Sequence, residues 1–152
     1  MLSYTTGSQD VASDKQILEK YGVTHILNLS KYCQNHFPDS ITYRNVQCDD
    51  YIHVKVCPMF PDSFKFIDEG RANGCVFIHC SAGVSRAATF TIAYLMKTEG
   101  MPFNEAFDYV KSKRPRICPN EGFMAQLRQY NQELSLSKQV HKNRDLTYTV
   151  HL

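Results

Sequence analysis

The sequence lacks any run of about eighteen or more apolar residues, so no membrane-spanning helix is predicted. The first residues lack the charged start and apolar stretch of a signal peptide, and they lack the glycine that N-myristoylation requires. We therefore expect neither a secretory leader nor a lipid anchor. The sequence also has little net charge, +2 at pH 7, which is too small to indicate nucleic-acid binding.

The cysteine pattern indicates neither a metal site nor a redox motif. No two cysteines have a Cys-x-x-Cys spacing, and we expect no metal and no cofactor. Without a secretory leader, the thiols are expected to be free in a reducing compartment. We therefore expect a cytoplasmic location, with the nucleus as the alternative. The cysteines are Cys33, Cys48, Cys57, Cys75, Cys80 and Cys118.

The chain has the length of one domain, and it contains no internal repeat. Buried-strand patterns are followed by helical apolar stripes, which predicts an α/β domain whose helices cover a small sheet. Residues 1–135 are expected to form this domain. From Ser135 onward no apolar stripe persists, so residues 136–152 are predicted to be a solvated, mobile C-terminal tail. Strands are predicted at 24–29, 41–46 and 75–79, and the longer helices near Phe60, Ala88, Phe103 and Asn120.

One stretch joins a buried strand to a central helix through a short loop of small residues. The strand leads to His79 and Cys80, and the loop ends at Arg86. At a helix N-terminus, unpaired N–H groups and the helix dipole favour an anion. Gly83 allows a sharp turn, so successive N–H groups can face one point and form a nest for phosphate. The predicted phosphate-binding residues are Ser81, Ala82, Gly83, Val84, Ser85 and Arg86.

Cys80 is expected to lie at the floor of this nest. A free cysteine titrates near pH ~8.5, and its pKa falls to roughly 3.5–7.5 at helix N-termini or beside cations. The predicted species is a thiolate facing phosphate, a nucleophile for phosphoryl transfer. The alternative is an inert buried thiol with a surface arginine. Arg86, however, enters a helix that is apolar on nearly all sides and needs an anionic partner, which its planar fork can hold by two oxygens.

His79-Cys80, five further residues and Arg86 resemble the signature of the cysteine-based protein tyrosine phosphatase superfamily. The form His-Cys-Ser-Ala-Gly-Val-Ser-Arg-Ala-Ala is similar to its dual-specificity branch, as are 7–10 and 114–124. The resemblance covers roughly Gly7 to Leu134 and points to the small atypical members, which have little beyond the catalytic domain. It implies a mostly parallel or mixed sheet of about four to five strands flanked by helices. It also implies a shallow pocket that takes phosphotyrosine as well as phosphoserine or phosphothreonine.

Cleavage of a phosphate ester also needs a proton for the leaving oxygen. A positioned carboxylic acid supplies it, at a typical gain of about 10²–10⁴-fold. Asp49 and Asp50 follow a predicted strand, on a loop that could overhang the site. The resemblance implies Asp50 as the general acid, because 43–50 matches the stretch that precedes the acid in the family, with Asp49 as the alternative. The same carboxylate would then activate water against the cysteinyl-phosphate.

The resemblance also implies supporting residues and one departure. The histidine equivalent to His79 tunes the cysteine and orders the loop, and Ser85 braces the loop. Asn120 either ties the last helix to the phosphate loop or is an ordinary helix N-cap. The family often has serine or threonine directly after the arginine, whereas this chain has Ala87. We therefore expect slower breakdown of the phosphoenzyme, without loss of activity.

These features predict a metal-independent dual-specificity protein phosphatase. Some small members of the family are linked to stress-activated MAP kinase pathways. Similarity to them implies phosphorylated proteins of those pathways as partners, although no docking motif in the sequence supports this. We expect a monomer that engages neither nucleic acid nor membrane.

Two alternatives stay open at this point. The first is a phosphatase-like module that binds or scaffolds phosphorylated kinases with little turnover. Cys80, Arg86 and Asp50 count against it, and Ala87 counts slightly for it. The second is an enzyme for another phosphate ester, such as a phosphoinositide or an RNA 5′ end. The loop lacks the extra lysines that favour a highly charged lipid head group, which argues for a protein substrate.

Overall fold

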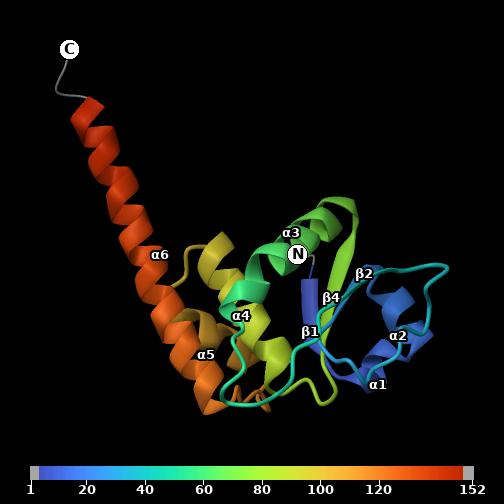
Figure 1. Cartoon of the computed structure of the whole chain (residues 1–152). Coiled ribbons are helices and arrows are strands. Elements are labelled where there is room, and N and C mark those ends of the chain that lie inside the picture. Colours follow the sequence, from blue (N-terminus) through green and yellow to red (C-terminus); the bar gives the residue numbers. More distant parts are fainter. Residues whose placement is uncertain (1–3, 149–152) are drawn as a thin grey trace.

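The computed structural model describes residues 4–148, of which 140–148 are described by their helical backbone alone. A four-stranded sheet lies at the centre, in the order β1-β4-β2-β3, and every neighbouring pair is parallel (Figure 1). This confirms the predicted α/β fold. The strands are β1 (Tyr4–Gly7), β2 (Val23–Asn28), β3 (Thr42–Asn45) and β4 (Cys75–His79).

Helices cover the two faces of the sheet unequally (Figure 1). The larger core lies on one face, where helices α3 to α6 pack with the short 3-10 helix η1 (Cys57–Met59). The smaller core lies on the other face, under two short helices. The larger set is α3 (Phe60–Asn73), α4 (Arg86–Thr98), α5 (Phe103–Lys113) and α6 (Glu121–Tyr148), and the short helices are α1 (Gln9–Ala12) and α2 (Lys15–Lys20).

Strand β4 and helix α4 carry the centre of the molecule. Val76 and Ile78 face the larger core, and Phe77 faces the smaller one, as expected for a strand of a parallel sheet that is buried on both faces. All residues of α4 from Ala87 to Met96 are buried, which confirms the predicted central helix. The segment between β4 and α4 is therefore held at both ends by fully buried structure.

The last helix is longer than the sequence analysis predicts. The apolar stripe ends at Leu134, yet α6 continues to Tyr148, so the tail predicted at 136–152 is helical up to that residue. The reason is local: residues 123–148 contain neither glycine nor proline, and leucine, glutamine, lysine and arginine favour a helix without tertiary contacts. Side chains 135–139 are exposed. Residues 149–152 lie outside the described range. No helix within residues 4–148 combines the length and apolarity needed to cross a membrane.

Candidate active site

The loop between β4 and α4 is a tight turn at the carboxyl edge of the sheet, where open α/β sheets bind ligands. It runs from Cys80 to Ser85, and α4 begins at Arg86. Gly83 has φ +65°, a conformation that glycine adopts without strain. A Cβ at this position would lie 2.4 Å from the carbonyl carbon of Gly7. Only glycine therefore lets the loop pack this closely against the end of β1.

Main-chain donors from two other segments fix the ends of this loop. The N–H of Gln9 donates to the carbonyl oxygen of Ser81 at 3.0 Å, and the N–H of Cys118 donates to that of Val84 at 2.8 Å. The two intervening carbonyls are bound by one side chain. Arg114 donates from Nε to Gly83 at 2.8 Å. It also donates from Nη2 to Ala82 at 3.2 Å.

These outward-facing carbonyls determine where the amide groups of the loop point. A trans peptide directs its C=O and its N–H to opposite sides. The carbonyls of residues 81–84 all bind partners outside the loop, so the N–H groups of residues 82–85 face its inner side. Four inward N–H groups at a helix N-terminus are suited to bind an anion. This orientation of the amides is the one that the predicted phosphate nest would need, and phosphate binding itself stays a prediction.

The guanidinium of Arg86 has two hydrogen-bonded Nη groups and, among the described residues, one unpaired N–H. Its Nη1 donates to the carbonyl oxygen of Cys48 at 3.2 Å, and its Nη2 donates to the hydroxyl of Ser81 at 3.2 Å. The Nε–H is buried and has no hydrogen-bond partner among the described residues. A buried unpaired donor costs about 1–3 kcal/mol, so an anion that accepts from Nε would be bound favourably. Arg86 is therefore held in place through its Nη groups, and its Nε–H is left without an acceptor among the described residues.

Cys80 follows the last residue of β4 and is 2% exposed. It is one of six cysteines that are all free. The neighbouring Ser81 contacts Ser30, two residues after β2, because their hydroxyl oxygens lie 3.3 Å apart. Cys80 therefore lies at the junction between β4 and the loop, packed against the larger core.

The structure brings three predicted residues from distant segments together. Ser85 Oγ donates to Asp50 Oδ1 at 2.7 Å, and Asn120 Nδ2 donates to the same oxygen at 2.8 Å. The backbone N–H of Asn120 donates in turn to Ser85 Oγ at 3.0 Å. Asn120 Oδ1 accepts from the N–H of Phe123 at 2.9 Å, in the first turn of α6. Asn120 thus contacts the loop through Ser85 and also caps the first turn of α6, the two roles that the sequence analysis gives as alternatives.

The two candidate carboxylates have different surroundings. Asp50 is tied to the phosphate loop through Ser85. Asp49 instead forms an ion pair with Lys31, at 3.1 Å, on the surface. Of the two carboxylates, Asp50 is the one that is hydrogen-bonded to the loop.

His79 is fully buried behind the loop. Among the described residues, its ring makes no hydrogen bond to the thiol of Cys80. Its Nδ1 lies 3.3 Å from the carbonyl oxygen of Cys80, and its ring stacks on Phe77. Burial lowers the pKa of His79 to about 4, so the imidazole is neutral at pH 7. It can order the loop, but it does not add a positive charge beside Cys80 at neutral pH.

This buried imidazole makes stability depend on pH. The unfolded chain binds a proton on His79 near pH ~6.5, whereas the folded chain binds it only near pH 4. Stability is therefore lost as the pH falls through this window, by about 2 kcal/mol between pH 7 and pH 5. We expect urea unfolding of His79→Asn to show a correspondingly smaller loss. The exposed His53→Asn variant should keep the wild-type slope, and an equal loss in all three proteins would contradict this assignment.

Arg114 is the site residue that the sequence analysis missed. It lies in the 114–124 run that resembles the family, but its partners are backbone carbonyls, which leave no pattern in a sequence. We expect Arg114→Ala to weaken binding of inorganic phosphate about 10-fold, the equivalent of about 1.4 kcal/mol for the lost hydrogen bonds. Calorimetry measures this directly. Arg116→Ala, an exposed arginine on the same segment, is the matched control and should bind phosphate as the wild type does.

Comparisons with known proteins give one consistent family. The sequence profile described as "Dual specificity phosphatase, catalytic domain" matches residues 5–133. Mouse dual specificity protein phosphatase 19 is 45% identical over 125 residues, which are 82% of this chain and 57% of that protein. The Dictyostelium discoideum MAP kinase phosphatase with leucine-rich repeats protein 1 is 42% identical over 129 residues, 85% of this chain and 15% of that protein. The chain thus spans little more than half of the first relative and a small part of the second.

Solved structures show the same likeness in three dimensions. Human DUSP28 superimposes with a TM-score of 0.85 at 28% identity, over 90% of this chain and 96% of that one. The human tyrosine phosphatase-like serine/threonine/tyrosine-interacting protein superimposes with a TM-score of 0.80 at 33% identity, over 86% and 91% of the two chains.

Proposed function

This chain belongs to the dual specificity phosphatase family, and we propose that it is a metal-independent protein phosphatase acting on phosphotyrosine and on phosphoserine or phosphothreonine. One observation carries the proposal. The inward amides of residues 82–85 and the unpaired Nε–H of Arg86 form an anion site, and the carboxylate of Asp50 is tied to the same loop by Ser85. These contacts support the proposal that a nucleophile, a phosphate cradle and an acid act together.

In the first step, the thiolate of Cys80 attacks phosphorus. A sulfur–phosphorus bond forms as the bond to the ester oxygen breaks, and Asp50 gives its proton to the departing oxygen. The loop amides and Arg86 bind the equatorial oxygens, where charge is spread in the transition state. Because these donors are fixed by Gln9, Arg114 and Cys118, little reorganisation is needed when the substrate binds.

In the second step, water displaces the thiolate from phosphorus. Asp50, now ionised, accepts a proton from the water, and the sulfur–phosphorus bond breaks to return the Cys80 thiolate and release phosphate. Asn120 and Ser85 donate to Asp50 Oδ1 and so hold the carboxylate in position between the two steps. The sum of the steps is hydrolysis of one phosphate ester by one water.

At position 87 this chain has alanine, which lacks the hydroxyl by which serine or threonine could stabilise the departing thiolate. It is fully buried in the first turn of α4, directly after Arg86. We expect Ala87→Ser to speed decay of the phosphoenzyme about 10-fold, which corresponds to one hydrogen bond to a charged group of about 1.5 kcal/mol. Single-turnover quench-flow measures the decay. Ala88→Ser, one position further along the helix, is the control, and an unchanged decay rate in Ala87→Ser would remove the assignment.

The substrate class follows from the family. We propose phosphorylated proteins, including members of MAP kinase pathways, and the name of the Dictyostelium relative supports that choice. Six free cysteines, with Cys80 as a nucleophile that oxidation would destroy, suit a reducing compartment such as the cytoplasm or nucleus.

The test is phosphate release from matched peptides carrying phosphotyrosine or phosphothreonine, in buffer with EDTA. We expect release from both. Release only from a phosphoinositide or from an RNA 5′ end would overturn the choice of protein substrates.

A binding module is the second candidate, because one structural neighbour is named as tyrosine phosphatase-like and as an interacting protein. Tight peptide binding without any phosphate release would favour that candidate over the enzyme.

A further inference from the structure

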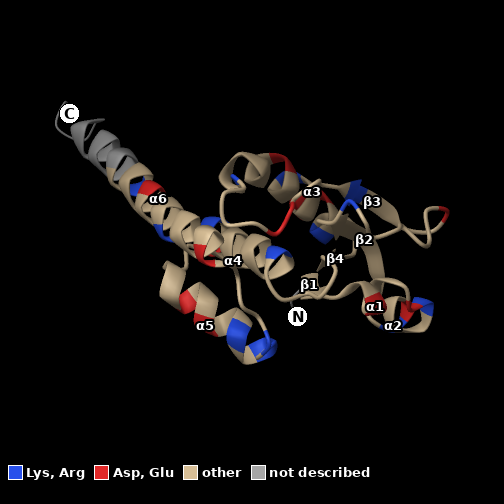
Figure 2. Ribbon diagram, turned by 60° about the horizontal axis from the view of Figure 1, so that its bottom comes forward, with Lys and Arg blue, Asp and Glu red and all other residues tan. Residues whose placement is uncertain are grey.

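The proposed general acid lies on a segment without regular secondary structure. Residues 46–56, which we call the acid loop, connect β3 to η1 and form neither a helix nor a strand. Figure 2 shows the acidic pair of this loop, Asp49 and Asp50, in red, and Figure 1 shows the loop passing the start of α6. Because no ladder or helix fixes such a segment, the contacts that other parts of the chain make with it determine where the carboxyl group of Asp50 lies.

The chain before Asp50 is fixed by the sheet and by the phosphate site. The N–H of Val46 donates to the carbonyl oxygen of Asn28 at 2.9 Å. Arg86 Nη1 donates to the carbonyl oxygen of Cys48 at 3.2 Å. These bonds hold the first residues of the acid loop, and the chain after Asp50 is fixed by other groups.

One side chain of α6 binds the chain after Asp50 at two points. Gln126 Oε1 accepts from the N–H of Val56 at 2.9 Å, and Gln126 Nε2 donates to the carbonyl oxygen of Val54 at 2.8 Å. The side-chain amide thus bonds to the loop as the main chain of a neighbouring strand would, through one acceptor and one donor. Val56 is fully buried, so removing this amide would leave a buried N–H without its acceptor.

The first turn of α6 also supports the acid loop by a close approach of the two backbones. A Cβ on Gly122 would lie 1.9 Å from the carbonyl oxygen of Ile52 and 2.6 Å from its carbonyl carbon. Only glycine therefore lets the helix lie this close to the loop. Residues four apart lie on one side of a helix, so Gly122 and Gln126 form one supporting surface for the acid loop.

We propose that Gln126 is a positioning residue for the general acid. Its amide holds residues 54–56 against α6 and thereby keeps Asp50 within reach of the leaving oxygen. Among the described residues, this side chain bonds only to main-chain groups of residues 54, 56 and 122, so it acts through Asp50 and not on the phosphate. The inference rests on the proposed function, in which Asp50 gives its proton to the leaving group.

The variant that tests this role is Gln126→Met, which removes both hydrogen bonds and keeps an unbranched side chain that favours a helix. We expect release from a phosphoserine peptide, which needs the acid, to slow by about 10- to 100-fold. Release from p-nitrophenyl phosphate, whose leaving group needs no proton, should stay within about twofold. The matched control is Gln129→Met, because the amide of Gln129 bonds to Glu133 on the same helix. Both of its rates should equal those of the wild type.

Gly122→Ala tests the same support without touching a hydrogen bond of the side chain. Alanine favours a helix more than glycine does, so α6 should stay formed while the acid loop is displaced. We expect the same split between the phosphoserine peptide and p-nitrophenyl phosphate. Urea unfolding establishes that each variant is folded under the assay conditions.

A double substitution separates positioning of the acid from a general loss of structure. In Asp50→Asn the acid is already absent, so adding Gln126→Met should change release from the phosphoserine peptide by no more than about twofold. A residue that only supports the fold would slow the Asp50→Asn enzyme by the same factor as the wild type.

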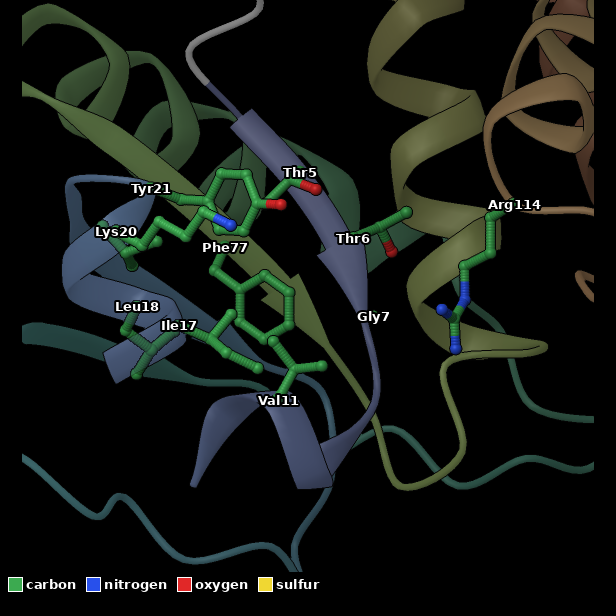
Figure 3. A pocket seen from close by; sticks show the side chains of 11 residues that line it. Thr5, Thr6, Gly7, Val11, Ile17, Leu18, Lys20, Tyr21, Phe77 and Arg114 are labelled. Carbon is green, nitrogen blue, oxygen red and sulfur yellow. The ribbon is translucent and has the colours of Figure 1, made fainter. Parts of the chain in front are cut away.

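Binding of inorganic phosphate gives a second distinction. Arg114 holds the phosphate loop itself, and Figure 3 shows its side chain pointing toward that loop. Arg114→Ala is therefore expected to weaken phosphate binding. Gln126→Met alters the acid loop and should bind phosphate as the wild type does, which calorimetry measures.

Equal slowing of both substrates by Gln126→Met would overturn the inference. An undiminished effect in the Asp50→Asn background, or an equal loss in Gln129→Met, would do the same. Each of these results would leave the proposed phosphatase activity standing. A wild-type chain that releases phosphate from neither substrate would instead overturn the proposed function and, with it, this role of Gln126.

Discussion

Replacing Cys80 by serine is expected to lower phosphate release by on the order of 10⁴–10⁶-fold while phosphopeptide binding is retained. A serine hydroxyl is a weak nucleophile without a general base beside it, and His79 contacts the carbonyl of residue 80. The phosphate cradle is unaffected, because its amides and Arg86 are held by groups other than the thiol. Hydrolysis of p-nitrophenyl phosphate and calorimetric binding of a phosphotyrosine peptide measure the two properties separately.

The control is Cys118→Ser. Cys118 binds the loop through its backbone N–H, so the loss of an exposed side chain should leave both turnover and binding unchanged. Turnover that survives in Cys80→Ser would refute a covalent intermediate on this residue. A simultaneous loss of binding and folding would instead show that the thiol is needed for the core.

Replacing Asp50 by asparagine is expected to slow release from a phosphoserine peptide by about 10²–10⁴-fold, and to slow release from p-nitrophenyl phosphate far less. An alkoxide leaves slowly without a proton, whereas p-nitrophenolate leaves readily without one. Asparagine keeps an oxygen that can accept from Ser85 and Asn120, so the loop geometry should persist. Parallel assays of the two substrates give the ratio that identifies a general acid.

Asp49→Asn is the matched control. It removes a surface ion pair with Lys31, which solvent screens, and should leave both rates within about twofold. Should Asp49→Asn show the dependence on the leaving group instead, the acid would be Asp49. Equal slowing of both substrates in Asp50→Asn would assign that residue a structural role.

The parts of the site that could be predicted are those carried by contiguous residues. The strand, the loop and the buried helix follow one another from Val76 to Met96, and local patterns define each of them. Asp50 and Asn120 could be named only through resemblance, because nothing in their local sequence shows that they meet at one oxygen of Asp50.

Contacts to the main chain were beyond sequence reasoning. Arg114 binds carbonyl oxygens, which every residue has, so no partner residue signals the contact. The continuation of α6 past Leu134 was missed for a different reason. Apolar periodicity reports packing against a core, and a solvent-exposed extension of a helix has none.

The link from Asp50 through Ser85 to Asn120 has a consequence for the order in which this protein matures. Chains are made from the N-terminus, and a nascent chain that stops at Lys113 already contains the cysteine and its cradle. It contains neither Arg114, which donates hydrogen bonds to the loop carbonyls, nor Asn120, which donates to the carboxylate of Asp50. The complete hydrogen-bonded arrangement around the loop and Asp50 therefore forms only after α6 has been made and packs against the domain.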